Sequence, residues 1–186
     1  MRSSVVILAG PPGAGKSTVA ARIARRHPKA VHLRTDDFWQ YIVAGAIPPY
    51  EPASRAQNET VMDAIAGAAF TYAAGGFVTV VDGIVGPWML DHFRKQAQVP
   101  LHYAVLRPYR DVALARAQGR AAPDALVDRH PILTMWDQFA DLGVLESHVF
   151  DTSDEDVTET ERRVAEAIDS GRLRLTLYAR AKPCFQ

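Results

Sequence analysis

Residues 5–18 read VVILAGPPGAGKST, an apolar run followed by a glycine-rich loop. The loop fits the pattern G-x-x-x-x-G-K-[ST] at every fixed position, and the apolar run before it predicts a buried strand. After Lys16, apolar residues recur at helical spacing up to about Arg26, which predicts a helix there. The stretch therefore predicts a strand, a tight loop and a helix in direct succession.

This order predicts a site for the phosphates of a nucleoside triphosphate. Glycine lets the loop turn its backbone N–H groups inward around an anion, and the N-terminus of the following helix adds partial positive charge. Lys16 is expected to bridge the β- and γ-phosphates of ATP, and the Ser17 hydroxyl to ligate Mg²⁺. The residues expected to contact the nucleotide here are Gly10, Pro11, Pro12, Gly13, Ala14, Gly15, Lys16, Ser17 and Thr18.

Length and composition indicate one α/β domain spanning residues 1–186. The chain carries 21 basic and 21 acidic residues, so its formal net charge is zero and it shows no electrostatic signature for nucleic acid or an anionic membrane. The single Cys184 excludes an internal disulfide and favours a reducing compartment. Because no apolar stretch has membrane-spanning length, we expect a cytoplasmic protein with small-molecule partners.

Strand-like runs alternate with helical patterns along the chain. This alternation predicts a three-layer α/β fold, in which a parallel five-stranded sheet has helices on both faces. The strands are expected at Val5–Ala9, Ala30–Leu33, Val78–Val81, His102–Leu106 and Ser147–Phe150. Helices are expected at Lys16–Arg26, Phe38–Ala44, Ser54–Ala74, Pro87–Gln96, Arg110–Gly119, Ile132–Leu142 and Val157–Ser170. In the tail 173–186, apolar and polar residues alternate, which favours an edge strand or a subunit contact and leaves a homodimer open.

Acidic residues follow two of the predicted strands. Asp36 and Asp37 come after the second strand, where a carboxylate can accept the proton of an attacking hydroxyl or face the metal. We predict that Asp36 takes that role and that Asp37 contacts the substrate; the alternative is a helix cap, for which Asp37 is better placed. Asp82 ends the third strand and is predicted on the Mg²⁺ side, with Gly83 leaving space for substrate. The alternative for this pair is a turn at the strand end.

Arginines surround a segment that Gly119 and a proline interrupt, which is typical of a lid at about 117–131. Arg120 and Arg129 are predicted to stabilise charge on the transferred phosphoryl group, and Arg116 to contact the nucleotide. The alternative is that each arginine only lies on a solvated helix face.

Aromatic and polar residues gather in the segment of about 37–75 and again after the third strand. This mixture favours an organic acceptor, although packing roles are the alternative for each residue. The predicted substrate contacts besides Asp37 and Gly83 are Trp39, Tyr50, Arg55 and Trp88.

With these motifs in place, the chain resembles the small P-loop kinases of the gluconate kinase and chloramphenicol phosphotransferase type, over about residues 4–170. The resemblance rests on the phosphate loop, Asp36-Asp37-Phe38, Pro48-Pro49-Tyr50-Glu51, Val80-Val81-Asp82 and Leu106-Arg107-Pro108. Such sequences are often described as AAA-family putative kinases. The resemblance implies a sheet order of 2-3-1-4-5, ATP·Mg²⁺ as the donor and Asp36 as base or metal-side carboxylate.

The residues favour an ATP-dependent phosphotransferase that acts on a hydroxyl of a small molecule, of the sugar acid, nucleoside or antibiotic class. Alternatives are a cytidylate-like nucleoside monophosphate kinase and a nucleotide-dependent switch or binding ATPase. A kinase of polynucleotide ends or a toxin acting on a sugar nucleotide also stays open. No pattern in the sequence identifies the acceptor.

Overall fold

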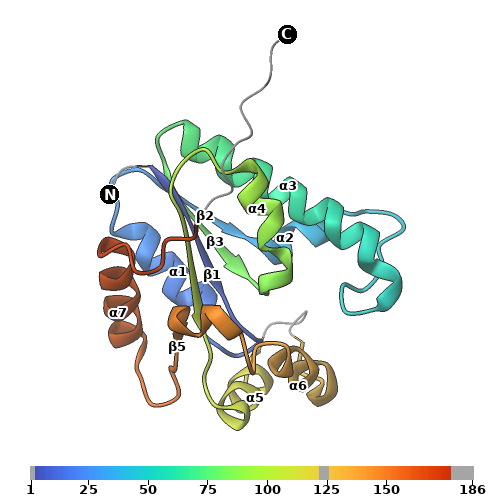
Figure 1. The fold of residues 1–186 in the computed structure, drawn as a ribbon. Helices are drawn as coiled ribbons and strands as arrows, with labels where there is room; N and C mark the ends of the chain where they lie inside the picture. The colour runs from blue at the N-terminus through green and yellow to red at the C-terminus, as the bar shows by residue number, and fades with distance from the viewer. Residues whose placement is uncertain (1–2, 122–125, 177–186) are drawn as a thin grey trace.

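Five parallel strands form the centre of the protein, in a computed structural model that describes residues 3–121 and 126–176 (Figure 1). They pair in the order β2-β3-β1-β4-β5, which confirms the order expected from the resemblance. The strands are β1 (Ser4–Ala9), β2 (Ala30–Arg34), β3 (Val78–Gly83), β4 (Leu101–Leu106) and β5 (Val149–Phe150). Because all five run in the same direction, their carboxyl ends meet at one edge of the sheet.

The described helices correspond to the predicted ones. They are α1 (Lys16–Arg25), α2 (Thr35–Gln40), α3 (Arg55–Ala74), α4 (Leu90–Gln96), α5 (Arg110–Gln118), α6 (Arg129–Asp137) and α7 (Val157–Asp169). Of these, α2 and α6 both begin and end several residues earlier than expected. Short 3₁₀ helices add η1 (Pro52–Ser54), η2 (Pro87–Met89) and η3 (Gly143–His148).

Helices cover both faces of the sheet, as the alternating sequence pattern predicts. Helices α1 and α7 pack on the face to which Val6 and Leu8 of β1 point, and α3 and α4 pack on the opposite face with Val5 and Ile7 (Figure 1). The sheet and both sets of helices therefore form three layers around two apolar cores, and α5 and α6 lie at the end of the molecule toward which the phosphate loop points (Figure 1).

Helix α2 differs from the prediction at both ends. It begins at Thr35 rather than Phe38 and ends at Gln40 rather than Ala44. Asp36 and Asp37 therefore lie inside its first turn, where their charges favour the helix N-terminus. The N-cap position belongs to Arg34, which makes no side-chain cap hydrogen bond, so the interpretation of Asp37 as the cap is wrong.

The chain after α7 pairs with the start of β4, on the side that the short β5 leaves open. Tyr103 N donates to the Leu173 carbonyl at 2.9 Å, Leu175 N donates to the Leu101 carbonyl at 2.9 Å, and an antiparallel bridge joins His102 to Arg174. Leu173 and Leu175 are buried. The predicted edge pairing is thus present at residues 173–175, while residues 177–186 of the predicted tail lie outside the described part of the chain.

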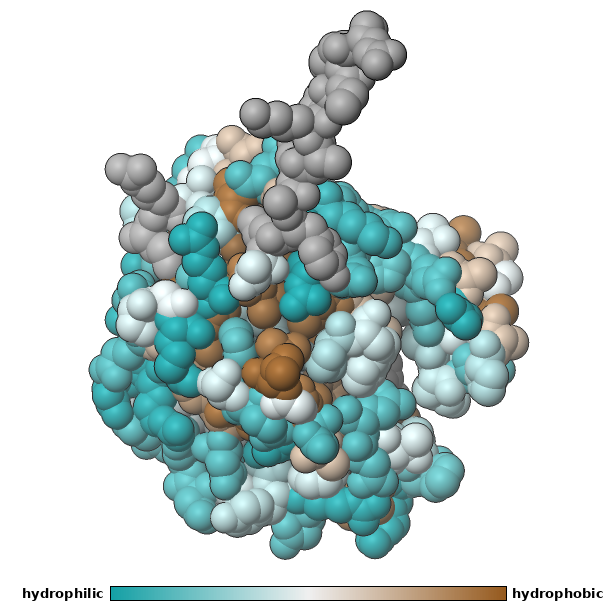
Figure 2. Space-filling model, in the orientation of Figure 1, coloured by the Kyte–Doolittle hydropathy of each residue, from teal (hydrophilic) through white to brown (hydrophobic). Residues whose placement is uncertain are grey.

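Figure 2 shows that the face seen in Figure 1 is mostly hydrophilic, with hydrophobic residues gathered near its centre. None of the helices in residues 3–121 and 126–176 combines the length and the apolar composition that a membrane crossing requires.

We expect Leu173→Ala to lower the free energy of unfolding by about 2–5 kcal/mol, because it removes a fully buried leucine from the edge of the sheet. Denaturant unfolding followed by circular dichroism measures the change. Val144→Ala is the control, since Val144 is 95% exposed and its loss should change stability by less than about 0.5 kcal/mol. Equal effects of the two substitutions would contradict the edge pairing.

Candidate active site

The phosphate loop joins β1 to α1 and passes close to two neighbouring elements. Gly10 has φ 144° and Gly13 has φ 79°, conformations that residues with side chains rarely adopt. A Cβ atom at Gly10 would collide with the carbonyl oxygen of Leu106 in β4, and one at Gly13 with that of Ala113 in α5. The loop therefore keeps its course only with glycine at these two positions, and this backbone fits a phosphate group.

Lys16 is buried at the start of α1, and its Nζ donates a hydrogen bond to the Pro11 carbonyl at 2.9 Å. Burial lowers the pKa of Lys16 to about 8, while the negative charges of Asp36 and Asp82 oppose this shift and the charge of Arg120 adds to it. Two predicted acidic residues and one predicted lid arginine therefore act electrostatically on the same ammonium group.

Asp82 lies at the end of β3 and uses both carboxylate oxygens. Ser17 Oγ donates to Oδ2 at 2.5 Å, and His32 Nε2 lies 2.6 Å from Oδ1. Burial alone would raise the pKa of Asp82, but hydrogen bonds from His32 and Ser17 outweigh it and hold the pKa below its ordinary value. The predicted Ser17 and Asp82 thus meet, and His32 completes a cluster that sequence reasoning missed.

These oxygens fit Mg²⁺. A hydroxyl and a carboxylate are hard donors, and Mg²⁺ in nucleotide sites is held by one or two protein groups together with phosphates and water. Within the described residues, no group of three or more His, Cys, Asp or Glu side chains could hold a metal ion. Ser17 and Asp82 are the residues that would hold the ion.

The space expected over Gly83 is filled by Thr35. A Cβ atom at Gly83 would collide with the Thr35 side chain, and Thr35 is buried. The expectation that Gly83 leaves room for substrate is therefore wrong, because its missing side chain makes room for the first residue of α2. This close packing fixes where α2 begins, and so where Asp36 lies.

The segment between α2 and α3 is held by its own polar groups. Trp39 Nε1 donates to Asn58 Oδ1 at 2.9 Å, and Asn58 Nδ2 donates to the Pro49 carbonyl and to Ser54 Oγ, both at 2.8 Å. The predicted substrate contact Trp39 thus has a structural partner for its only polar atom. These bonds fold the segment back onto the start of α3.

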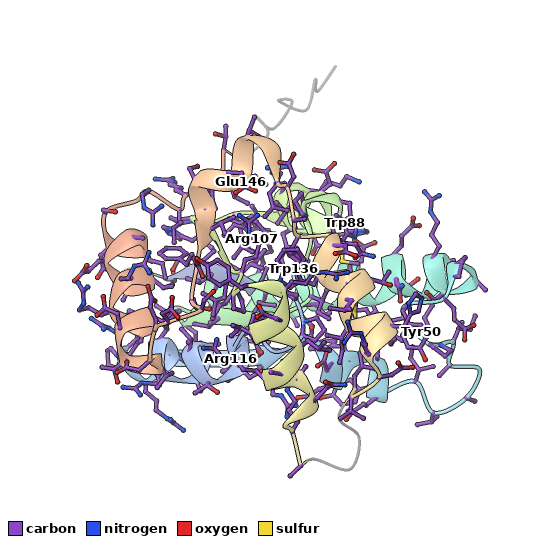
Figure 3. All side chains as sticks on the ribbon, turned by 90° about the horizontal axis from the view of Figure 1, so that it is seen from below. Tyr50, Trp88, Arg107, Arg116, Trp136 and Glu146 are labelled. Carbon is purple, nitrogen blue, oxygen red and sulfur yellow. The ribbon has the colours of Figure 1, made fainter. Side chains whose placement is uncertain are left out.

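The other predicted substrate contacts do not converge on one point. Arg55 pairs with Glu59 on the surface of α3, and Tyr50 is 61% exposed. Figure 3 shows Tyr50 beside α3 and apart from Trp88, which packs against Phe139 with ring centroids 5.9 Å apart. Asp37 forms a partly exposed ion pair with Arg34, in which Asp37 Oδ1 lies 3.6 Å from Arg34 Nη1.

Two arginines, Arg107 and Arg116, bind segments that lie far from them in the sequence (Figure 3). Arg116 of α5 donates to the carbonyls of Thr152 at 3.1 Å and Ser153 at 3.0 Å, in the loop that follows β5. Arg107 pairs with Glu146 at 2.8 Å and also donates to the Phe139 carbonyl. Arg116 thus joins α5 to the loop after β5.

The predicted lid is described at its two ends. Arg120 follows α5, while Arg129 is the exposed first residue of α6. Asp128 caps α6 by accepting a hydrogen bond from His130 N at 3.1 Å. The centre of the predicted lid, residues 122–125, lies outside the described residues.

Solved structures share this fold at low sequence identity. The gluconokinase from Sinorhizobium meliloti 1021 has a TM-score of 0.67 and 17% identity, over 90% of this chain and 93% of that one. The tunicamycin resistance protein of Deinococcus radiodurans has a TM-score of 0.64 and 18% identity, over 96% and 99%. The APS kinase of Mycobacterium tuberculosis, solved with AMPPNP and APS, has a TM-score of 0.62 and 17% identity, over 90% and 98%.

The fold is therefore that of P-loop kinases, and the resemblance to them is confirmed. No curated protein sequence matches this chain. The sequence profile of a family described as an AAA domain matches residues 5–142, which is most of the chain. This stretch includes the phosphate loop, both acidic strand ends and the predicted lid, and the protein belongs to that AAA-domain family.

Proposed function

We propose that this protein is an ATP-dependent phosphotransferase that moves the γ-phosphoryl group of ATP to a hydroxyl of a small organic molecule. The observation that carries the proposal is an intact phosphate loop in which Lys16 is buried, together with two carboxylates, Asp82 near the end of β3 and Asp36 in the first turn of α2. One carboxylate is bound to Ser17 on the metal side, and the other is exposed on α2. The names of the gluconokinase and of the APS kinase solved with AMPPNP support the same reaction class.

In the proposed reaction the acceptor oxygen attacks the γ-phosphorus in line with the bond to the β–γ bridging oxygen. That bond breaks, its electron pair leaves with ADP, and the proton of the acceptor hydroxyl passes to Asp36. Lys16 and the loop N–H groups bind the phosphates, and Arg120 and Arg129 offset the charge that develops on the transferred group. Mg²⁺, when held by Ser17 and Asp82, would neutralise the phosphate oxygens.

The acceptor is assigned to the segment of about 37–75, and closure over the site to the segment of about 117–131. Arg116 and the loop after β5 are assigned to the nucleotide base. The protein would act in the cytoplasm, where ATP is abundant, with a small molecule as its partner.

An ADP-release screen tests the reaction with sugars, sugar acids, nucleosides, nucleoside monophosphates and antibiotics as acceptors. We expect turnover with a hydroxyl compound and its loss in Lys16→Ala. That substitution should also weaken ATP binding by about 10- to 100-fold, because hydrogen bonds to charged groups contribute roughly 1.5–3 kcal/mol. Lys95→Ala on the surface of α4 is the control for losing a lysine. Turnover with nucleoside monophosphates alone, or tight ATP binding without any transfer, would contradict the proposal.

Asp36→Asn should lower kcat by about 10²–10⁴-fold and leave ATP affinity nearly unchanged, because it removes the proton acceptor and keeps the shape of the side chain. Asp37→Asn, in the same helical turn, should act mainly on the KM of the acceptor. Steady-state kinetics with calorimetry for ATP separate the two effects. A kcat for Asp36→Asn close to wild type would exclude it as the base.

Arg120→Ala should lower kcat by about 10²–10³-fold, the cost of removing one preorganised donor from a transition state. Arg129→Ala should cost less, because it is Arg120 whose charge reaches Lys16 in this structure. Both rates are compared at saturating ATP and acceptor. A larger loss for Arg129 would show that the closed state uses the far end of the lid instead.

A further inference from the structure

We propose that His32 is a positioning residue for the metal side of the site, where it fixes the orientation of the Asp82 carboxylate toward Ser17. The inference rests on the proposed function, since it concerns how the protein receives ATP with Mg²⁺. It assigns a role to a histidine that lies on β2, away from the phosphate loop in sequence.

Three neighbouring elements meet at the Asp82 carboxylate. In the parallel register, His32 of β2 pairs with Val80 of β3, and Arg34 pairs with Asp82. His32 therefore lies two residues before Arg34, the residue opposite Asp82. Side chains two residues apart point to the same face of a sheet, and this is the face that α1 covers. The imidazole therefore reaches forward along the sheet surface to Asp82, while Ser17 approaches from α1.

The two carboxylate oxygens have separate partners. His32 Nε2 lies 2.6 Å from Oδ1, and the Ser17 hydroxyl donates to Oδ2 at 2.5 Å. An ionised carboxylate only accepts hydrogen bonds, so the nitrogen that faces it carries the proton. Asp82 is 4% exposed, which leaves water little access to replace either bond.

The bond from His32 limits how far the Asp82 carboxylate can rotate on the metal side of the site. The terminal torsion of an aspartate is broad, so a carboxylate held at one oxygen alone can rotate away from its second partner. The bond from His32 removes that freedom before any nucleotide arrives. Partners that orient ligating carboxylates in this way typically change metal affinity by about 10- to 100-fold when they are removed.

A purely structural role for His32 would be to tie β2, an edge strand, to β3. Loss of that tie would weaken every form of nucleotide binding together with stability. Loss of a positioning residue should instead weaken only the gain in affinity that Mg²⁺ provides. The ratio of nucleotide affinity with Mg²⁺ to nucleotide affinity without Mg²⁺ therefore distinguishes a positioning role of His32 from a structural one.

Calorimetry with the non-hydrolysable analogue AMPPNP, with Mg²⁺ and with EDTA, measures this ratio. We expect His32→Leu to bind metal-free AMPPNP as the wild type does and to lose about 10- to 100-fold of the gain from Mg²⁺. His32→Gln should restore most of the gain, because its amide nitrogen is as many bonds from the backbone as Nε2. His32→Asn, one bond shorter, should not restore it, and this polar pair keeps the test valid if the leucine variant does not fold.

His92→Leu is the matched control. His92 Nδ1 lies 2.7 Å from Asp63 Oδ1 in a second histidine–aspartate pair between α4 and α3. Its loss should leave the Mg²⁺ gain unchanged. If His32→Leu and His32→Asn keep the wild-type gain, the inference is overturned and the proposed function stands. If the wild type itself shows no gain from Mg²⁺, both fall together.

Discussion

The passage of the phosphate loop between β4 and α5 is the constraint on which the rest of the site depends. Gly10 runs against the last residue of β4 and Gly13 against α5, with no room for a side chain at either point. The loop is therefore positioned by the sheet and by the helix that leads into the predicted lid. Contact with both elements fixes the start of α1, and with it the positions of Lys16 and Ser17, before any ligand binds.

Burial of Lys16 gives the site its electrostatic character. A pKa lowered to about 8 corresponds to about 3 kcal/mol of lost preference for the charged form, even with two carboxylates nearby. A phosphate group would supply the negative charge that the buried ammonium lacks. For Asp82 burial acts in the other direction and would raise the pKa of the carboxyl group. Hydrogen bonds from His32 and Ser17, together with the charge of Lys16, outweigh burial and hold that pKa below its ordinary value.

The sequence could predict what is decided locally. The phosphate loop, the strand before it and the helix after it follow from one motif, and the apolar strand ending at Asp82 follows from its composition. The start of α2 could not be predicted, because it depends on Thr35 packing against Gly83, a contact between distant segments. The space expected over Gly83 and the alternative of Asp37 as the helix cap were wrong for this reason. His32 was missed because its partner is set by the register of β2 on β3, which the spacing of residues does not encode.

The two halves of the candidate site, the phosphate side and the acceptor side, also differ in how far the sequence predicts them. The phosphate side uses backbone N–H groups, one lysine and hard oxygens, and this chemistry suits every nucleoside triphosphate. The proposed acceptor side is a segment whose polar groups, among them Trp39 and Asn58, are already paired with each other. Those pairs shape the segment, so under the proposed function recognition of an acceptor would depend on Asp36 and on the side chains that the pairs leave at the surface. Such side chains follow no common sequence pattern, because different acceptors need different contacts. A sequence can therefore identify the phosphate donor clearly and still contain no motif that identifies the acceptor.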